Sequence, residues 1–559
     1  MSEFFVRSLV RNVLWGFLVV VGSLQAIERP NILLLMAEDM SPRVGAFGDE
    51  IAVTPNLDAL AAKGVRYTHT FTTAGVCAPS RSAHIMGVNQ ISLGAQHMRT
   101  SERKEGGYKT VPPAPLKAYP ELLRAAGYYT FTDSKLDYQF SGTLAGSGPM
   151  SIWSDEGFRT SWRKRASGQP FFGFINFNVT HESGTFAPLG AWPESFLHFK
   201  MQVIRAVFEG FQKDSEPVAP EGVVLPPYYP DIPSVRTEIA RHYNNIHAMD
   251  KQVGALLMQL TRDGLADDTI VIWTTDHGDG LPRAKRELFD SGLRVPMIIY
   301  WPEKWRPVSV KAGAPDERMI SFVDLAPTVL SLAGVEQPEY FQGRDFLSVE
   351  TPPRRYIYAT RDRIDEVMDR QRAVRDRRFK YIRSWHPEVS GGHPLAFRDI
   401  QVMTRDMRAL WKAGKLSPVQ ARWFESVGRE QLYDLHNDPH ELTNLAKNPA
   451  WRHELERLRA ALDEWLERVG DRSAQPEAEM VEALLCEGEP CVTPAPQIQR
   501  DKNHVVLKST VVGASIVYRL DDGPWQVYTD PFPADEGTEI SAHAQRYGWR
   551  LSEAVNLEL

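Results

Sequence analysis

The sequence has no excess of positive charge. Its 559 residues include 64 Lys and Arg against 71 Asp and Glu, which gives a formal net charge of −7. Proteins that bind nucleic acid carry a basic surface patch and often a net positive charge. The charge balance therefore gives no support for nucleic-acid binding. It says little about a small anionic substrate, because a single site can be locally basic.

The N-terminus has an apolar run, but a short one. Arg7 and Arg11 precede apolar residues 13–21, and small or neutral residues follow to Ala26. The run is too short to span a bilayer comfortably, and this arrangement is typical of a secretion signal. We therefore predict a signal peptide at 1–26, export to the periplasm or secretion, and no stable membrane span after processing. An uncleaved anchor is the alternative.

Cysteine is rare, with three residues in the chain. Cys486 and Cys491 lie close together, and a local disulfide between them would suit an exported protein. Two free surface thiols are the alternative. Cys77 is the odd one out, which suits a residue with a dedicated chemical task.

The pattern around Cys77 predicts the start of a helix. In the segment CAPSR at 77–81, Pro79 suits the first turn, where its missing N–H costs nothing. Gly87 suits the exit. Cys77 would then lie at the helix N-terminus, which favours an anion, with Arg81 one turn further on the same side. This places a reactive atom beside a fixed positive charge, as a sulfate, phosphate or carboxylate requires. A buried structural Cys is the alternative.

Predicted strands alternate with predicted helices in the first 300 residues. Buried apolar runs at 31–36, 171–177, 269–273 and 295–300 indicate strands, and 128–132 is a further predicted strand. Helical spacing of apolar residues extends from 237 to 260. This alternation predicts a parallel α/β sheet covered on both faces. In such sheets, ligands bind beyond the carboxyl ends of the strands.

Reactive and charged side chains follow these strands directly. Because the carboxyl ends of parallel strands meet at one edge, acids, His and Lys from distant segments would come together there. Two adjacent carboxylates at a strand end are costly unless a cation or a basic side chain pairs them, and their oxygens suit a hard divalent ion such as Ca²⁺ or Mg²⁺. A solvated acidic loop is the alternative for an isolated Glu-Asp pair. The residues just after predicted strands are Glu38, Asp39, Lys135, His181, Asp276 and His277.

This combination resembles the type I, formylglycine-dependent sulfatases of the alkaline phosphatase superfamily. The segment 77–81 is similar to their Cys-x-Pro-Ser/x-Arg signature, and 29–39, 276–278 and 292–296 are similar to further family segments. The resemblance covers roughly residues 29–475. Within the family, the overall pattern is similar to heparan N-sulfatase and iduronate sulfatase.

The resemblance implies a role for each residue of the cluster. A maturation enzyme would oxidise Cys77 to formylglycine, whose hydrated aldehyde is the nucleophile. Arg81 would fix the hydrate, Lys135 and Lys285 would bind sulfate oxygens, and His181 would face the leaving group. One Ca²⁺, or alternatively Mg²⁺, would be held by Glu38, Asp39, Cys77, Asp276 and His277.

Three positions depart from the family pattern. Glu38 stands where Asp is usual, and His277 stands where many members have Asn. Asp137 replaces the His of a Lys-x-His motif, so the role of that His is unfilled or altered. The candidates for substrate binding are His97, Asp137 and Glu182, with an ordinary polar loop as the alternative for His97.

The resemblance also implies an alkaline-phosphatase-like α/β fold, with a large mixed, mostly parallel sheet sandwiched by helices. A smaller antiparallel subdomain follows, and then a small β-sandwich. Trp525 and Tyr528 of the sandwich would pack in its core, with glycan contact as the alternative. The predicted regions are a signal peptide at 1–26, a catalytic domain at 27–350, a C-terminal subdomain at 351–474, a linker at 475–497 and the sandwich at 498–559.

The predicted function is hydrolysis of sulfate esters or N-sulfates of a sulfated glycan, with heparan-type sulfate as the first guess. The loops at 97–108, 137–151 and 182–192 contain bases and aromatic residues that suit an anionic sugar. One alternative is a phosphonate monoester or phosphodiester hydrolase of the same superfamily. A second is a non-catalytic glycan-binding protein with a degenerate site.

Overall fold

The computed structural model describes residues 28–98, 108–209, 216–308, 310–501 and 503–559. The predicted signal peptide at 1–26 lies outside this range, as does much of the loop at 97–108. Among the described helices, none has the length and apolar character that crossing a membrane requires.

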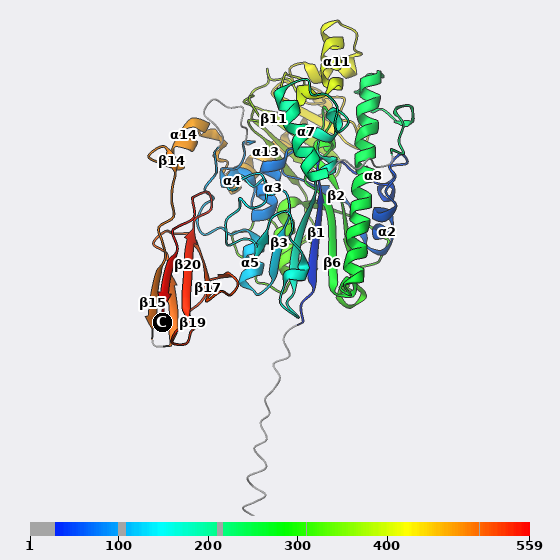
Figure 1. Ribbon diagram of the computed structural model, residues 1–559. Helices are drawn as coiled ribbons and strands as arrows, with labels where there is room; N and C mark the ends of the chain where they lie inside the picture. The colour runs from blue at the N-terminus through cyan, green and yellow to red at the C-terminus, as the bar shows by residue number, and fades with distance from the viewer. Residues whose placement is uncertain (1–27, 99–107, 210–215, 309, 502) are drawn as a thin grey trace, which may run out of the picture.

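An eight-stranded sheet forms the centre of the predicted catalytic domain (Figure 1). Its order is β4-β3-β5-β1-β6-β7-β2-β8. Neighbouring strands are parallel except around β7, which is antiparallel to both β6 and β2. The predicted mixed, mostly parallel sheet is therefore confirmed. The strands are β1 (Asn31–Ala37), β2 (Val65–Phe71), β3 (Tyr129–Thr132), β4 (Asp155–Glu156), β5 (Phe171–Phe177), β6 (Thr269–Thr275), β7 (Arg294–Tyr300) and β8 (Pro315–Ser321).

Both faces of this sheet are buried. Ile32, Leu34 and Met36 of β1 join the core on one face, whereas Leu33 and Leu35 join the core on the other. Since successive side chains of a strand point to opposite faces, an all-apolar strand requires this two-sided cover. The covering helices are α3 (Cys77–Met86), α5 (Tyr119–Ala125) and α10 (Leu325–Leu332) on the first face, and α2 (Pro55–Lys63) and α8 (Pro233–Arg262) on the second (Figure 1).

The C-terminal subdomain contains an antiparallel sheet in the order β12-β11-β10-β9. The helix α13 (Arg452–Val469) packs on it through Leu458 and Leu462. The Asn448 side chain accepts a hydrogen bond from the Ala450 N–H and so caps the short 3-10 turn Pro449–Trp451 that leads into α13. The strands are β9 (Ile357–Arg361), β10 (Gln371–Arg375), β11 (Phe379–Ser384) and β12 (Glu430–Asp434).

The predicted linker contains ordered structure. It holds α14 (Glu477–Glu482) and a two-stranded ribbon of β13 (Leu485–Cys486) and β14 (Glu489–Pro490). The predicted disulfide between Cys486 and Cys491 is confirmed. The remaining helices are α4 (Gln90–Leu93), α6 (Ser183–Phe186), α7 (Phe196–Glu209), α9 (Asp290–Leu293), α11 (Val402–Lys412) and α12 (Pro418–Ala421).

Two small sheets form the C-terminal sandwich, in the orders β15-β16-β19 and β18-β17-β20-β21. Tyr528 packs against its core, and Trp525 lies against His543 with ring centroids 5.2 Å apart. Tyr547 is fully buried in the core of the catalytic region and donates to Glu121. The strands are β15 (Gln497–Asp501), β16 (His504–Lys508), β17 (Ser515–Leu520), β18 (Gln526–Val527), β19 (Phe532–Pro533), β20 (Glu539–Gln545) and β21 (Val555–Glu558).

Candidate functional site

Two neighbouring strands deliver the acidic cluster. The strands β1 and β6 are parallel, with Ala37 opposite Thr275, so the residues that follow them leave the sheet at the same edge. Glu38 and Asp39 follow β1, and Asp276 and His277 follow β6; all four are fully buried. The Asp39 N–H donates to Asp276 Oδ1 at 3.0 Å, which joins the two loops.

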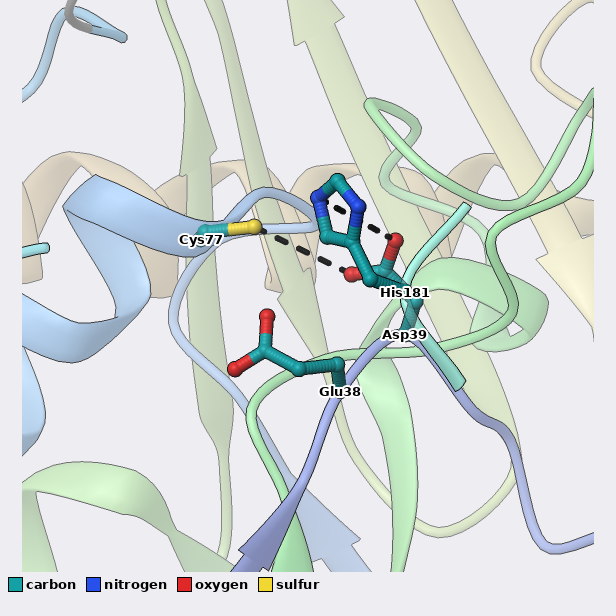
Figure 2. A group of neighbouring side chains, drawn as sticks. All are labelled: Glu38, Asp39, Cys77 and His181. Carbon is teal, nitrogen blue, oxygen red and sulfur yellow. Dashed lines mark hydrogen bonds and ion pairs between the residues drawn. The ribbon is translucent and has the colours of Figure 1, made fainter. Parts of the chain in front are cut away.

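Cys77 begins α3 and reaches this cluster, as its sequence context predicts. Its Sγ lies 3.3 Å from His277 Nε2. The same sulfur lies 3.8 Å from Asp39 Oδ1 (Figure 2). Gly87 ends the helix with φ 62°, in the left-handed region that suits glycine. Burial raises the pKa of the Cys77 thiol despite the nearby Lys135 and Lys285. The unmodified side chain is therefore a protonated thiol, which is a poor nucleophile.

Positive side chains are interleaved with the carboxylates. Arg81 pairs with Glu38, donates to Asp276 Oδ2 through Nε at 3.2 Å and donates to Asn176 Oδ1 at 2.9 Å. Lys135 also pairs with Glu38. These cations make it possible to bury several carboxylates at one point.

The charges of neighbouring groups shift the pKa values of Asp39 and His277. Lys285 Nζ lies 2.6 Å from Asp39 Oδ2. Burial raises the pKa of Asp39, but Lys285, His181 and His277 outweigh it and hold that pKa well below its usual value. Burial lowers the pKa of His277, but Asp276 and Asp39 outweigh it and raise that pKa well above its usual value.

His181 lies at the mouth of the cluster, and its side chain is 23% exposed. Its Nδ1 is 2.9 Å from Ser183 Oγ, and its Nε2 is 3.4 Å from Lys285 Nζ. Burial and the charge of Lys285 lower the pKa of His181 to about 3. The imidazole is therefore neutral at neutral pH and presents one face beside Asp39 and Cys77 (Figure 2).

The donor set fits a hard divalent cation. It forms two overlapping groups, in each of which one donor atom per residue lies within 4.8 Å of the others. Buried carboxylate oxygens with one imidazole suit Ca²⁺ or Mg²⁺. Among the described residues, the five predicted ligands do not form one such group. They are divided between two groups that share Asp39 and Cys77. The groups are Glu38, Asp39, Cys77 and His181, and Asp39, Cys77, Asp276 and His277.

A cavity of about 560 Å³ opens above Cys77. Among the predicted site residues, Lys135, Asp137, His181, Glu182 and Lys285 line it. Its walls include Leu197, Met201 and Ile204 of α7, together with Asp365, Glu366 and Phe397 from the C-terminal subdomain. Cys77 therefore faces a space large enough for a sugar ring.

The three residues predicted to bind substrate have different surroundings. Glu182 forms a two-point ion pair with Arg286 at 2.8 and 2.9 Å and lies 2.9 Å from Lys285. Asp137 lines the cavity 3.7 Å from Lys135. His97 is not among the residues that line the cavity; instead, its Nδ1 accepts from a backbone N–H at 3.2 Å.

Four residues of the site were missed by the sequence analysis. Asn176 orients Arg81, and Arg286 pairs with Glu182. Arg286 directly follows the predicted Lys285, which is a signal that could have been used. Asp365 and Phe397 come from the C-terminal subdomain, more than 280 positions from Cys77 in the sequence, and no local motif marks them.

Comparison with known proteins places these features in context. The family model described as Sulfatase matches residues 30–335, and a model described as N-sulphoglucosamine sulphohydrolase, C-terminal, matches 283–425. An ulvan-active sulfatase of Formosa agariphila is 38% identical over 561 residues, covering 95% of this chain and 91% of that protein. The N-sulphoglucosamine sulphohydrolase of Homo sapiens is 27% identical over 486 residues, covering 80% and 92%.

The fold has counterparts among solved structures. A structure titled as a 2-O GAG sulfatase matches with a TM-score of 0.55 and 19% identity, and the match covers 80% of this chain and 94% of the other. At this identity, the likeness concerns the fold alone, and it confirms the predicted architecture.

Proposed function

Because the chain belongs to the sulfatase family, we propose that it is an exported enzyme that releases sulfate from a sulfated glycan. One observation carries the proposal. Cys77 lies at the start of a helix, 3.3 Å from His277 in a buried acidic cluster, and faces a cavity of about 560 Å³. A reactive atom, a cation site and space for a saccharide therefore coincide.

The proposed nucleophile is formylglycine made from Cys77 by a formylglycine-generating maturation enzyme. The raised pKa of the thiol supports this step, since unmodified Cys77 would react poorly. The hydrated aldehyde would supply one hydroxyl group that attacks sulfur as the bond to the leaving group breaks, and the second hydroxyl, once deprotonated, would expel sulfate and restore the aldehyde. Arg81, which is held by Glu38 and Asp276, is placed one turn along α3 to orient that residue.

The proposed cofactor is one Ca²⁺, with Mg²⁺ as the alternative. Glu38, Asp39, Asp276 and His277 would hold it together with the residue derived from Cys77. When bound, the ion supplies positive charge that polarises the sulfate group.

The remaining side chains would act on the sulfate and its leaving group. Lys135 and Lys285 line the cavity and would bind sulfate oxygens, stabilising the negative charge as the bond to sulfur breaks. His181 is neutral in the free site, with a pKa of about 3. The negative charge of a bound sulfate would raise that pKa, which would let His181 protonate the leaving oxygen or nitrogen.

The substrate class is proposed from the relatives. The Formosa agariphila relative is described as ulvan-active, and the human relative as an N-sulphoglucosamine sulphohydrolase. Ulvan oligosaccharides and N-sulfoglucosamine are therefore the first substrates to test. The higher identity of the ulvan-active relative places ulvan ahead of the heparan-type sulfate expected from the sequence.

A substrate screen of the matured enzyme tests the proposal. Free sulfate is measured with ulvan, heparin, chondroitin, carrageenan and fucan oligosaccharides, and an aryl sulfate is compared with an aryl phosphonate. Release from at least one saccharide is expected. Turnover of the phosphonate alone would favour the phosphonate monoester or phosphodiester hydrolase. Turnover of none, with Cys77 shown by mass spectrometry to be converted and metal present, would favour a non-catalytic glycan-binding protein.

A further inference from the structure

Arg286 and Asp365 meet on the wall of the cavity without completing a hydrogen bond. Both terminal nitrogens of Arg286 donate hydrogen bonds to the Glu182 carboxylate, at 2.8 and 2.9 Å. The third nitrogen of the guanidinium group, Nε, takes no part in this pair. That Nε lies 3.5 Å from Asp365 Oδ2, and among the described residues neither atom has a hydrogen-bond partner. The side chain of Arg286 is 4% exposed and that of Asp365 is 15% exposed. A buried donor and a buried acceptor, each without a hydrogen-bond partner, therefore lie side by side on the cavity wall.

Such a pair is unusual in a folded protein. Buried polar groups nearly always have partners, and an unpaired one costs stability. At 3.5 Å, the Arg286 and Asp365 atoms attract each other as charges but are too far apart for a direct hydrogen bond. Both residues line the same cavity as Cys77, so the missing partner would come from a molecule bound there.

The loop that carries Asp365 is clamped from behind. Arg363 donates to Glu477 of α14 through Nε at 2.6 Å and Nη2 at 2.8 Å, and this pair is almost fully buried. Arg363 also donates to the backbone carbonyl of Asp365 at 2.7 Å, and its own N–H donates to His97. His97 and the predicted linker thus hold the wall of the cavity in place.

Arg286 is fixed just as firmly with respect to the nucleophile. Its backbone N–H donates to the carbonyl of Gly75 at 2.6 Å, two positions before Cys77. Its side chain is held by Glu182, whose N–H donates to Asp39 Oδ2 at 2.7 Å. The Arg286–Asp365 pair is therefore preorganised relative to the reacting centre, as a recognition site requires.

From this arrangement, and resting on the proposed function, we propose that Arg286 Nε and Asp365 Oδ2 form a subsite for one hydroxyl group of the sulfated sugar. A hydroxyl can accept a hydrogen bond from Nε and donate one to Oδ2 at the same time. A sulfate or carboxylate group offers only acceptors and would face the Asp365 carboxylate with like charge. The subsite therefore selects a neutral hydroxyl and rejects a second anionic group at this position of the ring.

The test compares a saccharide with a substrate that has no sugar hydroxyl. Asp365→Asn keeps the side-chain shape but removes the charge and weakens the acceptor. We expect kcat/KM for N-sulfoglucosamine or ulvan oligosaccharides to fall about tenfold or more, because hydrogen bonds to charged groups are strong. The value for 4-nitrophenyl sulfate should stay within about threefold. Glu350→Gln, an exposed carboxylate change, is the matched control and should leave both values unchanged.

Equal losses on saccharide and aryl sulfate, or no loss on either, would overturn the subsite. Sulfate release by the unchanged enzyme tests the proposed function separately. Calorimetric titration of the unmatured Cys77 protein with N-sulfoglucosamine and ulvan oligosaccharides tests the subsite without catalysis. In this titration, Asp365→Asn should raise the Kd of the saccharide that binds the parent by about tenfold. Equal affinity of the two proteins, or no binding of either saccharide by the parent, would again overturn it.

Discussion

The structure contains two buried clusters in which carboxylates alternate with Lys and Arg side chains. The cluster at the site, here called the open cluster, borders a cavity, whereas the central lysine of the other is enclosed by protein. At the site, Glu38, Asp39, Asp276 and Glu182 interleave with Arg81, Lys135, Lys285 and Arg286. The second cluster, here called the closed cluster, joins Asp290 of α9 to the C-terminal subdomain: Lys380 lies 2.6 Å from Asp290 and 2.7 Å from Glu441, and Arg375 lies 2.5 Å from Asp290. In each cluster, the carboxylates named here are matched by an equal number of Lys and Arg side chains.

The difference lies in where the cations face. Lys380 is fully buried: its ammonium group donates to the carbonyl of Leu288 at 3.1 Å and forms ion pairs with Asp290 and Glu441, so its charge is neutralised inside the protein. Lys135 and Lys285 line the cavity above Cys77. Burial of charge is therefore shared by structural and functional clusters, and an open face beside a reactive atom distinguishes the site.

Removing the reactive atom should have the largest effect on the open cluster. We predict that Cys77→Ala lowers sulfate release by at least about 10⁴-fold, because the hydroxyl that attacks sulfur derives from this residue. The melting temperature should hardly change, since the side chain makes only weak contacts through sulfur. Sulfate release and thermal unfolding are measured on enzyme made with its maturation enzyme. A variant that keeps substantial activity would contradict the assigned nucleophile.

Removing the cation should have the next largest effect. We predict that chelation lowers activity by about 10²–10³-fold and that Ca²⁺ restores it, because the sulfate charge would lose its main electrostatic partner. Metal analysis should find one ion per chain in the parent and less in Asp276→Asn. Glu441→Gln, in the closed cluster, should keep its metal. Full activity of a chelated protein shown to be metal-free would refute the assigned site.

The sequence was sufficient for the parts of the site that topology decides. Glu38 and Asp276 meet because β1 and β6 are buried parallel neighbours, and apolar runs reveal such strands. The residue roles stay predictions, although the structure brings those side chains together. The direction of β7 was not predictable. Its residues 295–299 are buried on both faces, and this apolar pattern is the same for a parallel and an antiparallel strand.

Contacts between distant segments were beyond the sequence. Glu182 and His97 were predicted to bind substrate, but their partners come from far along the chain: Arg286 is 104 positions from Glu182, and the loop at 363–366 that contacts His97 belongs to the C-terminal subdomain. The strand β2 was missed because its buried and partly exposed residues alternate irregularly, in a strand whose pairing with β7 and β8 contains register shifts. These features depend on three-dimensional packing and leave no periodic signal.

Breaking the closed cluster should affect stability rather than chemistry. We predict that Lys380→Met lowers the free energy of unfolding by about 3–5 kcal/mol, because Asp290 and Glu441 would lose a buried partner. Chemical denaturation measures this loss, and kcat of the remaining folded enzyme should change little. The double change Lys380→Met with Glu441→Gln should recover part of the stability. An undiminished stability of the single variant would show that the pair is not needed.

The smallest expected effect concerns a buried acid that belongs to neither cluster. Glu238 of α8 accepts from the Met403 N–H at 3.0 Å but makes no ion pair within the described part of the chain. Burial raises its pKa to about 8 from an ordinary 4.5. Between these values the folded state keeps a proton that the unfolded state loses, so stability falls as pH rises through this window and is constant above it. Glu238→Gln should therefore match the parent near pH 4.5 and exceed it by about 2–4 kcal/mol at pH 8. The free energy of unfolding of both proteins is measured across this pH range. A difference between them that does not change with pH would contradict the raised pKa of Glu238.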